Sequence, residues 1–228
     1  MSAARAELES LLRARKLDVT LTSWASWRAT DEDRLASTGS PALDALLDGG
    51  LRRGQLSEIV GARSSGRATL VAAIAAAATA RGEVVAIVDT HDRFDPASAA
   101  AAGVDLQRLL WIRDAGQADR ALKAMNLVLQ AGGFGVVVFD LADARPADFR
   151  RFPHTTWMRL SRVIEGSQTV ALIAGAEHIA RSAGGVTIAL DPSGDRRGEW
   201  AGDSTRSRRL HGLTVRPRIV SARVQGLA

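Results

Sequence analysis

The stretch LSEIVGARSSGRATL, residues 56–70, decides the fold. Its start, residues 56–60, predicts a short strand, and the alanine-rich run at residues 68–81 predicts a helix. Gly61 and Gly66 in the intervening loop have the spacing of the phosphate-loop pattern GxxxxGK[ST]. In such a loop, backbone N–H groups and the positive end of the helix dipole surround a phosphate. The stretch therefore predicts a strand–loop–helix unit with the shape of a phosphate loop.

Apolar strands and helices alternate along the chain beyond this unit. Short apolar runs predict strands at residues 84–88, 109–112, 136–139 and 169–174. Helix-forming segments lie at residues 41–47, 96–102, 117–130 and 146–165. Continuous apolar strands that alternate with helices are typical of a parallel sheet that helices cover on both faces. We therefore expect an α/β fold with a largely parallel β-sheet.

The N-terminal end departs from this alternation. Residues 4–17 place leucines on one side of a predicted short amphipathic helix. The following residues lack periodicity and carry Trp24 and Trp27, which we interpret as anchors in an extended arm. We expect a helix and arm over residues 1–36, separate from the core.

The C-terminal end also departs from the alternation. Residues 186–190 and 213–224 predict strands with no helix between them, and we expect antiparallel pairing at the sheet edge. The polar segment 191–209 between them is rich in arginine. Residues 37–228 are therefore predicted to form one core with an Arg-rich C-terminal hairpin.

The composition excludes several classes of protein and site. The chain has 228 residues, of which 46% are apolar and 24% charged, as in ordinary globular proteins. The absence of cysteine excludes disulfide scaffolds, thiol nucleophiles and Cys-ligated metals, and the four histidines lack metal-site spacing. No apolar run is long enough for a membrane span, and residues 1–16 lack the apolar stretch of a signal peptide. We expect a cytoplasmic protein without metal and without membrane contact.

The phosphate loop lacks the side chains that phosphoryl transfer needs. Arg67 stands at the lysine position, and Ala68 stands where a Ser or Thr hydroxyl would bind Mg²⁺. Thr69 follows one residue late and, on a helix, points about 100° away. Because metal and lysine supply most of the charge stabilisation in the transition state, we expect a poor catalyst. A tight strand-to-helix turn is the favoured interpretation, and a weak anion site is the alternative.

Several further motifs resemble the core of the RecA recombinase family over residues 37–224. The quoted motifs are Ser37-Thr38-Gly39-Ser40 with Asp44, Gly49-Gly50-Leu51, residues 61–69, Asp95-Pro96, Gly103-Val104-Asp105, the Walker-B-like residues 136–140 and Gly184-Gly185. The resemblance implies a RecA-like core. The large C-terminal domain of a recombinase has no counterpart in this sequence.

The departures from this family fall on its chemistry. His91 stands where RecA-like ATPases carry the Glu that orients the attacking water, and Asp92 is one residue away. Gly175 and Ala176 stand where the recombinase has an Asn-Gln pair that senses the γ-phosphate. Asp140 remains as the Walker-B residue. Because such elements act as a unit, we expect no catalytic residue, no cofactor and no ATPase activity.

Within the superfamily, the chain resembles the ImuA family of SOS mutagenesis accessory proteins. That resemblance implies a role in the SOS response to DNA damage, in mutagenic translesion DNA synthesis. It also implies binding to ImuB, a homologue of Y-family polymerases, to RecA in some members, and indirectly to an error-prone DNA polymerase. The expected location is the cytoplasm, at the nucleoid. The alternatives are a DNA-dependent ATPase or recombinase of RecA type, a SulA-like inhibitor of cell division, and a DNA-binding module.

Positive charge marks the candidate contact residues. The formal net charge is +5, and residues 191–228 hold eight arginines against four acids. The candidate contacts to DNA or to a partner are Trp24, Trp27, Arg150, Arg151, Arg206, Arg208, Arg209, Arg216 and Arg218. The resemblance adds His178 and Arg181, at the second DNA-binding loop. The alternatives are a solvated helix start at residues 150–151, a hairpin closing over its own sheet, and tryptophans packed on their own domain.

Overall fold

The structure is a computed structural model in which most of the core is described. The described residues are 34–141, 144–145, 147–148, 152–180, 184–190, 197–214 and 217–222. The predicted N-terminal helix and arm, with Trp24 and Trp27, lie outside these residues. The division of the chain at residue 36 therefore stays a prediction.

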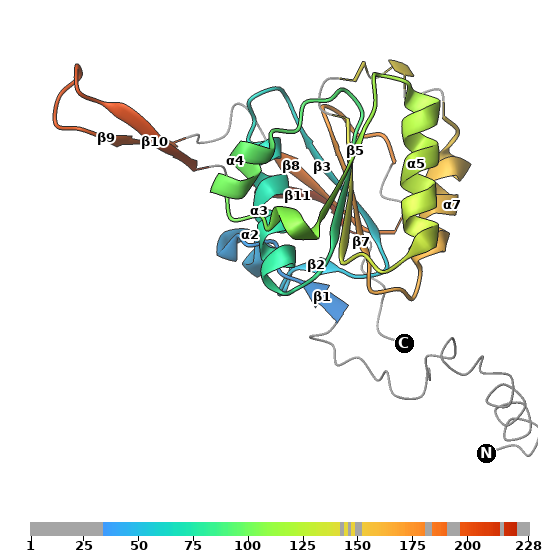
Figure 1. Cartoon of the computed structure of the whole chain (residues 1–228). Helices are drawn as coiled ribbons and strands as arrows, with labels where there is room; N and C mark the ends of the chain where they lie inside the picture. Colours follow the sequence, from blue (N-terminus) through green and yellow to red (C-terminus); the bar gives the residue numbers. More distant parts are fainter. Residues whose placement is uncertain are drawn as a thin grey trace, which may run out of the picture. The chain divides into compact units, whose positions relative to one another are not determined.

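A seven-stranded sheet forms the centre of the core (Figure 1). Its order is β11-β8-β3-β7-β6-β4-β5. The strands are β3 (Leu56–Gly61), β4 (Val85–Asp89), β5 (Leu109–Arg113), β6 (Val136–Asp140), β7 (Val170–Gly175), β8 (Val186–Leu190) and β11 (Pro217–Ala222). Six strands pair in parallel, and β11 pairs antiparallel with β8 at one edge. The predicted α/β fold is confirmed, with β8 itself parallel to its inner neighbour β3.

Helices cover both faces of this sheet (Figure 1). On one face lie α2 (Pro41–Leu46), α3 (Arg67–Ala80) and α4 (Pro96–Ala101), and on the other lie α5 (Ala118–Ala131) and α7 (His154–Ile164). Val85 and Ile87 of β4 belong to the first hydrophobic cluster, and Ala86 and Val88 belong to the second. Because side chains alternate along a strand, both layers require apolar residues at positions 85–88 of β4. This explains why the strand is a continuous apolar run.

Helix α7 is shorter than the predicted helix over residues 146–165. It begins at His154, directly after Pro153, which has an extended conformation with ψ 151°. Proline disfavours the helical conformation in the residue before it and cannot donate to a preceding turn. The expected segment is helical at residues 147–148 and again from His154, with a break at residues 152–153 that Pro153 could have indicated.

Hydrogen bonds and close packing hold the segment before α2 against the core. Asp44 accepts hydrogen bonds from Ser37 Oγ (2.6 Å), Thr38 N (2.8 Å) and Thr38 Oγ1 (2.7 Å). Gly39 has a φ of +76°, and a Cβ there would lie 2.8 Å from the carbonyl oxygen of Ala73 in α3. Strand β1 (Leu35–Ala36) pairs with β2 (Leu51–Arg52) beside this segment. The Ser-Thr-Gly-Ser motif thus closes the start of the core onto α2 and α3.

A separate antiparallel hairpin lies in the chain between β8 and β11. Strand β9 (Arg197–Ala201) pairs with β10 (Arg209–Thr214), with a register shift between Leu210 and Gly212. The expected antiparallel pairing at the sheet edge is that of β8 with β11, whereas the expected loop 191–209 contains β9. The expected strand 213–224 is divided between β10 and β11. Neither β9 nor β10 has a clear apolar alternation, so the pattern gave little signal.

No described helix is both long and apolar enough to cross a membrane.

Candidate functional site

The loop between β3 and α3 keeps the backbone geometry of a phosphate loop. A Cβ on Gly61 would lie 2.5 Å from Ser65 Oγ and 2.7 Å from the carbonyl oxygen of Leu190. Gly66 is the N-cap of α3 and has a φ of +97°, a region that glycine enters without strain. Ser64, with a φ of +58°, completes the tight turn. Both glycines of the spacing pattern are therefore required by local shape.

The side chains of this loop fit a phosphate better than they fit a magnesium nucleotide. Ser65 is 1% exposed, and its Oγ has no hydrogen-bond partner among the described residues. Helix α3 has no acidic residue in its first turn, so its N-terminal N–H groups face no local carboxylate. Arg67 is buried, and Ala68 presents a methyl group where a metal would need a hydroxyl oxygen. Thr69 is exposed. The residues present therefore do not fit a metal–triphosphate complex.

The end of β4 carries a hydrogen-bonded turn in place of a catalytic carboxylate. Thr90 Oγ1 donates to the carbonyl oxygen of Asp140 (2.8 Å) and lies 2.8 Å from His91 Nδ1. Since the hydroxyl has one proton, this pattern assigns the donor role to His91 Nδ1. The other ring nitrogen, Nε2, would lie 3.6 Å from a Cβ on Gly116. His91 is thus held by its own neighbour, at the position that the family resemblance gives to Glu.

Two carboxylates near His91 are engaged in structural contacts. Asp89 is 1% exposed and accepts hydrogen bonds from Phe94 N (2.7 Å), His91 N (3.2 Å) and Trp111 Nε1 (3.2 Å). Asp92 accepts two hydrogen bonds from Arg113, from Nε (2.7 Å) and Nη2 (2.6 Å). Both side chains hold the turn after β4, so neither is placed as a base for an attacking water.

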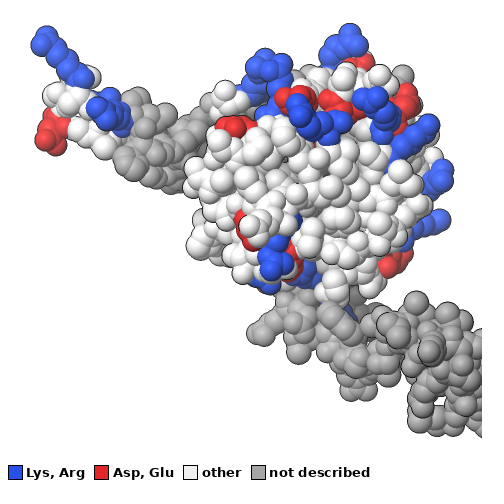
Figure 2. All heavy atoms as spheres, in the orientation of Figure 1, with Lys and Arg blue, Asp and Glu red and all other residues white. Residues whose placement is uncertain are grey.

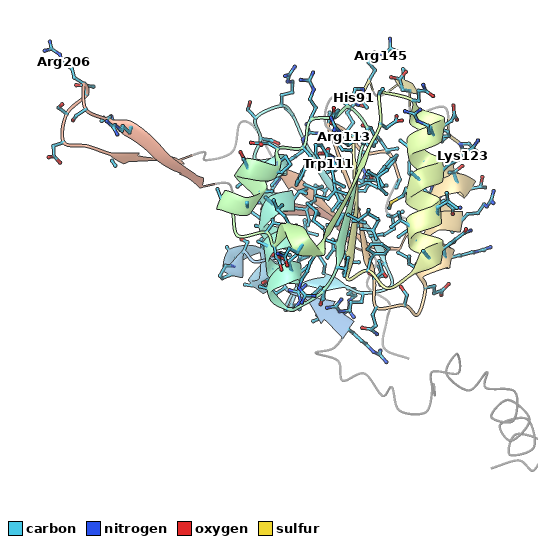
Figure 3. All side chains as sticks on the ribbon, in the orientation of Figure 1. His91, Trp111, Arg113, Lys123, Arg145 and Arg206 are labelled. Carbon is cyan, nitrogen blue, oxygen red and sulfur yellow. The ribbon has the colours of Figure 1, made fainter. Side chains whose placement is uncertain are left out.

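The ion pair between Asp92 and Arg113 extends into an aromatic contact. The guanidinium carbon of Arg113 lies 4.7 Å from the ring centre of Trp111. Figure 3 shows His91, Trp111 and Arg113 at the same end of the sheet. The hydrogen bonds from Arg113 lower the pKa of Asp92, and those to Asp92 raise the pKa of Arg113. The arrangement favours the charged state of both groups.

A buried carboxylate that the sequence analysis missed lies within β3. Glu58 is 1% exposed, and its Oε1 accepts hydrogen bonds from Ile179 N (2.9 Å) and Ala180 N (2.7 Å). Its Oε2 lies 2.6 Å from Nδ1 of His178. Glu58 therefore fixes the segment that follows β7, and His178 is occupied in this contact. The readable signal was a single charged residue inside the apolar run 56–60.

The remaining family positions also lie at the carboxyl ends of the parallel strands. Asp140 ends β6 and is paired in register with Ala174 of β7 and Asp89 of β4. Gly175 ends β7 and Ala176 follows it, so neither position offers a polar side-chain atom. No cluster of His, Cys, Asp or Glu suited to a metal occurs among the residues that the structure describes.

The predicted contact arginines are only partly described. Arg206, Arg208 and Arg209 are exposed near the tip of the β9–β10 hairpin, and Arg206 is labelled in Figure 3. Arg218 is exposed on the edge strand β11. Other predicted contacts lie outside the described residues, namely Trp24, Trp27, Arg150, Arg151, Arg181 and Arg216.

Comparison with known proteins identifies the family. The model of the RecA N-terminal domain matches residues 26–147, more than half of the 228 residues. The chain is 44% identical to Protein RecA of Chlorobium chlorochromatii over 105 residues. These residues make up 46% of this chain and 30% of that protein. Over 108 residues it is 39% identical to Protein RecA of Deinococcus radiodurans, which is 47% of this chain and 30% of that protein. The chain thus spans less than a third of the length of these two relatives.

A solved structure shows the same fold. The chain resembles the RadB recombinase with a TM-score of 0.55 and 20% sequence identity, covering 69% of this chain and 83% of that one. This likeness covers a larger share of the chain than the residues that the family model matches. On the family model and the shared fold, this chain belongs to the RecA N-terminal domain family.

Proposed function

We propose that this chain is a RecA-fold adaptor that does not hydrolyse ATP and acts in mutagenic translesion DNA synthesis after DNA damage. The observation that carries the proposal is the phosphate loop. Its glycine geometry is intact, whereas Arg67 is buried and Ala68 offers no metal ligand. The relatives named Protein RecA and RadB recombinase support a role in DNA repair or recombination.

The losses are concentrated on one reaction. The metal ligand, the lysine, the water-orienting carboxylate and the γ-phosphate sensor serve the same transition state, and their contributions are not additive. At the corresponding positions the chain has Ala68, Arg67, His91 and the Gly175-Ala176 pair. The nearby acids Asp89 and Asp92 are engaged in local hydrogen bonds. A scaffold that keeps the fold without this reaction accounts for all of these features.

The partners follow from the resemblance to the ImuA family. They are an ImuB-type homologue of Y-family polymerases, RecA, and through the complex an error-prone DNA polymerase. We propose that the assembly acts in the cytoplasm at the nucleoid. A binding experiment with purified ImuB-type protein tests this role directly. A complex at micromolar concentration is expected, and the absence of any complex would contradict the adaptor proposal.

The hairpin tip supplies the proposed contact to DNA. Arg206 and Arg209 are exposed there, and Asp203 is the one acid in the sequence of residues 201–209. Ser204, Thr205 and Ser207 add hydroxyl groups, and Ser204 and Ser207 bond to each other across the turn. Arginines with hydroxyls and no large apolar side chain suit the phosphate backbone of a nucleic acid.

A salt titration tests this contact. Each arginine that neutralises a phosphate contributes about 0.9 to the slope of log affinity against log salt for duplex DNA. The double substitution Arg206→Ala with Arg209→Ala is expected to weaken binding and to reduce the slope. The exposed Arg52, which lies on β2, provides the matched control Arg52→Ala. Equal slopes for the wild type and the double variant would exclude the hairpin as the contact.

A further inference from the structure

The outer faces of α5 and α7 carry a group of unpaired cations. Lys123 of α5 and Arg159 and Arg162 of α7 are exposed, and they make no ion pair or hydrogen bond within the part of the chain that is described. Several other cations of the core are engaged with carboxylates. Such pairs are Arg53 with Glu83, Arg113 with Asp92, and Arg120 with Asp114. Lys123, Arg159 and Arg162 share the lack of a described partner with the exposed Arg52, and differ from it in lying together on two neighbouring helices.

Each helix also exposes an aliphatic side chain beside a cation. Leu127 follows Lys123 by four residues and is 64% exposed, and Val163 follows Arg159 by four residues and is 36% exposed. Residues four apart on a helix lie on the same face. Leu127 has the largest exposed fraction among the large apolar side chains of the described residues. The same pairing of a cation with an aliphatic residue thus occurs on both helices.

The two pairs lie on one surface of the molecule. Helices α5 and α7 pack against each other and each follows a strand of the parallel sheet, so they run in the same direction. Figure 1 shows them side by side in one layer, and Figure 3 shows Lys123 pointing away from that layer. Figure 2 shows Lys and Arg side chains gathered along the border of the core where these helices lie. We call Lys123, Leu127, Arg159, Arg162 and Val163 the helix face.

Acidic residues of these helices lie away from the centre of the helix face. Asp119 lies in the first turn of α5, and Glu165 follows the end of α7. Arg120 is occupied by Asp114, which is nearly buried. Asp119 is four residues before Lys123 and Glu165 is three residues after Arg162, so the two acids flank the helix face, which keeps a net positive charge from its three cations.

We propose that the helix face docks a segment of a partner protein that carries both carboxylates and apolar side chains. Cations without local partners attract carboxylates, and the exposed leucine and valine gain free energy only when an apolar surface covers them. A phosphate backbone uses the cations and leaves Leu127 uncovered, in contrast to the hairpin tip, which has no large apolar residue. The composition of the helix face therefore favours an acidic amphipathic segment over nucleic acid. This surface extends the proposed adaptor role and does not depend on the loss of ATP hydrolysis.

A fluorescence anisotropy titration of the full chain tests this inference. The probe is a fluorescein-labelled amphipathic helical peptide of glutamate and leucine. Two comparison probes are a glutamate-only peptide and single-stranded DNA. The wild type is expected to bind the amphipathic peptide more tightly than the glutamate-only peptide, and binding is expected to weaken with added salt. Failure of the wild type to bind the amphipathic peptide would overturn the inference.

Charge-reversal variants locate the site. The triple substitution Lys123→Glu, Arg159→Glu and Arg162→Glu is expected to weaken peptide binding by about tenfold or more, because like charges then face the probe. Leu127→Ser is expected to weaken binding of the amphipathic peptide severalfold and to leave binding of the glutamate-only peptide unchanged. The single variants Arg159→Glu and Arg52→Glu form a matched pair, and only the first is expected to weaken binding.

Two outcomes would overturn the docking surface. One is unchanged peptide binding by the triple variant. The other is a loss of DNA binding by that variant while peptide binding is retained, because the face would then be a nucleic-acid contact. All substituted positions are exposed, so circular dichroism is expected to show an intact fold. Phosphate release by the same preparations tests the proposed function separately.

Discussion

The segment from Ser37 to Asp44 and the phosphate loop are both shaped by glycines, yet their polar side chains differ. In the first segment, Asp44 accepts three hydrogen bonds from its own neighbours. In the loop, the buried Ser65 Oγ has no partner in the described part of the chain. The polar groups of the first segment are hydrogen-bonded within the fold. The loop has an equally tight backbone, but its buried hydroxyl has no described hydrogen-bond partner. The difference separates a segment whose polar groups stabilise the fold from a loop whose buried hydroxyl is not needed for hydrogen bonding within it.

The largest loss of stability is expected from a substitution in the segment from Ser37 to Asp44. Asp44→Ala removes an acceptor of three short hydrogen bonds, and bonds to charged groups contribute about 1.5–3 kcal/mol each. We expect a loss of about 3 kcal/mol in the free energy of unfolding, since solvent replaces part of the lost bonding. Urea denaturation measures it, and Asp44→Asn is the control because it keeps one acceptor oxygen. A stability equal to wild type would show that Asp44 does not fasten this segment.

The shape of the phosphate loop is expected to matter somewhat less. The added Cβ of Gly61→Ala meets the backbone oxygen of Leu190 at 2.7 Å, so we expect a loss of about 2 kcal/mol from overpacking. Gly82→Ala is the control, since nothing lies within 4 Å of its Cβ and its φ of +84° gives strain alone, about 1 kcal/mol. Thermal denaturation compares the two variants. If Gly61→Ala is the milder of the two, the loop is not held by close packing.

The ion pairs of Glu83 with Arg53 and Arg81 are expected to make a smaller, pH-dependent contribution to the free energy of unfolding. Burial of Glu83 raises its pKa, but hydrogen bonds from Arg81 and Arg53 outweigh this, so the net pKa lies below the ordinary 4.5. A lowered pKa stabilises the fold above pH 4.5, and this contribution is lost as the pH falls from there through the lower folded value. Glu83→Gln should therefore cost about 1 kcal/mol at neutral pH.

The difference between wild type and Glu83→Gln should shrink in acid. Urea denaturation at pH 7 and below pH 4 measures it, with the exposed Glu165→Gln as the control. A difference that grows on acidification would contradict the pairing of Glu83 with the two arginines.

The smallest change in stability is expected from a substitution of Ser65 in the phosphate loop. Ser65→Ala removes a buried hydroxyl that has no described partner, so the usual loss on deleting a hydrogen-bonding group is absent. We expect stability within about 1 kcal/mol of wild type, with a gain as the favoured sign. Thermal denaturation of Ser65→Ala beside Thr38→Val, which removes a hydroxyl bonded to Asp44, gives the direct contrast. A clear loss for Ser65→Ala would mean that the loop hydroxyl is used within the fold.

Local sequence patterns predicted the architecture because the burial of a strand and the shape of a tight loop depend on their own residues. Apolar runs such as 136–139 cover both faces of a parallel strand, and the glycine spacing of the loop reflects backbone shape. The strands β9 and β10 lack such a pattern, so their exact extent was not readable. The break before α7 was readable from Pro153, whereas the sequence analysis took residues 146–165 as one segment.

Contacts between distant residues were outside the reach of sequence patterns. Glu58 and His178 are 120 positions apart, and Asp92 and Arg113 are 21 apart. Nothing in the local sequence says which carboxylate meets which cation, because the pairing depends on how strands β3, β7, β4 and β5 are placed in the sheet. The departures from the phosphate-loop pattern at Arg67 and Ala68 were readable, since they concern residue identity alone.

Phosphate release from ATP in the presence of Mg²⁺ and single-stranded DNA tests the central claim most directly. We expect no release above the protein-free background, and no gain from the double substitution Arg67→Lys with Ala68→Thr, because His91 and Gly175 remain unchanged. Calorimetric titration of the same samples with ATP and Mg²⁺ is expected to show no metal-dependent binding. DNA-stimulated turnover that Arg67→Ala abolishes would contradict the account and would make this chain a working ATPase.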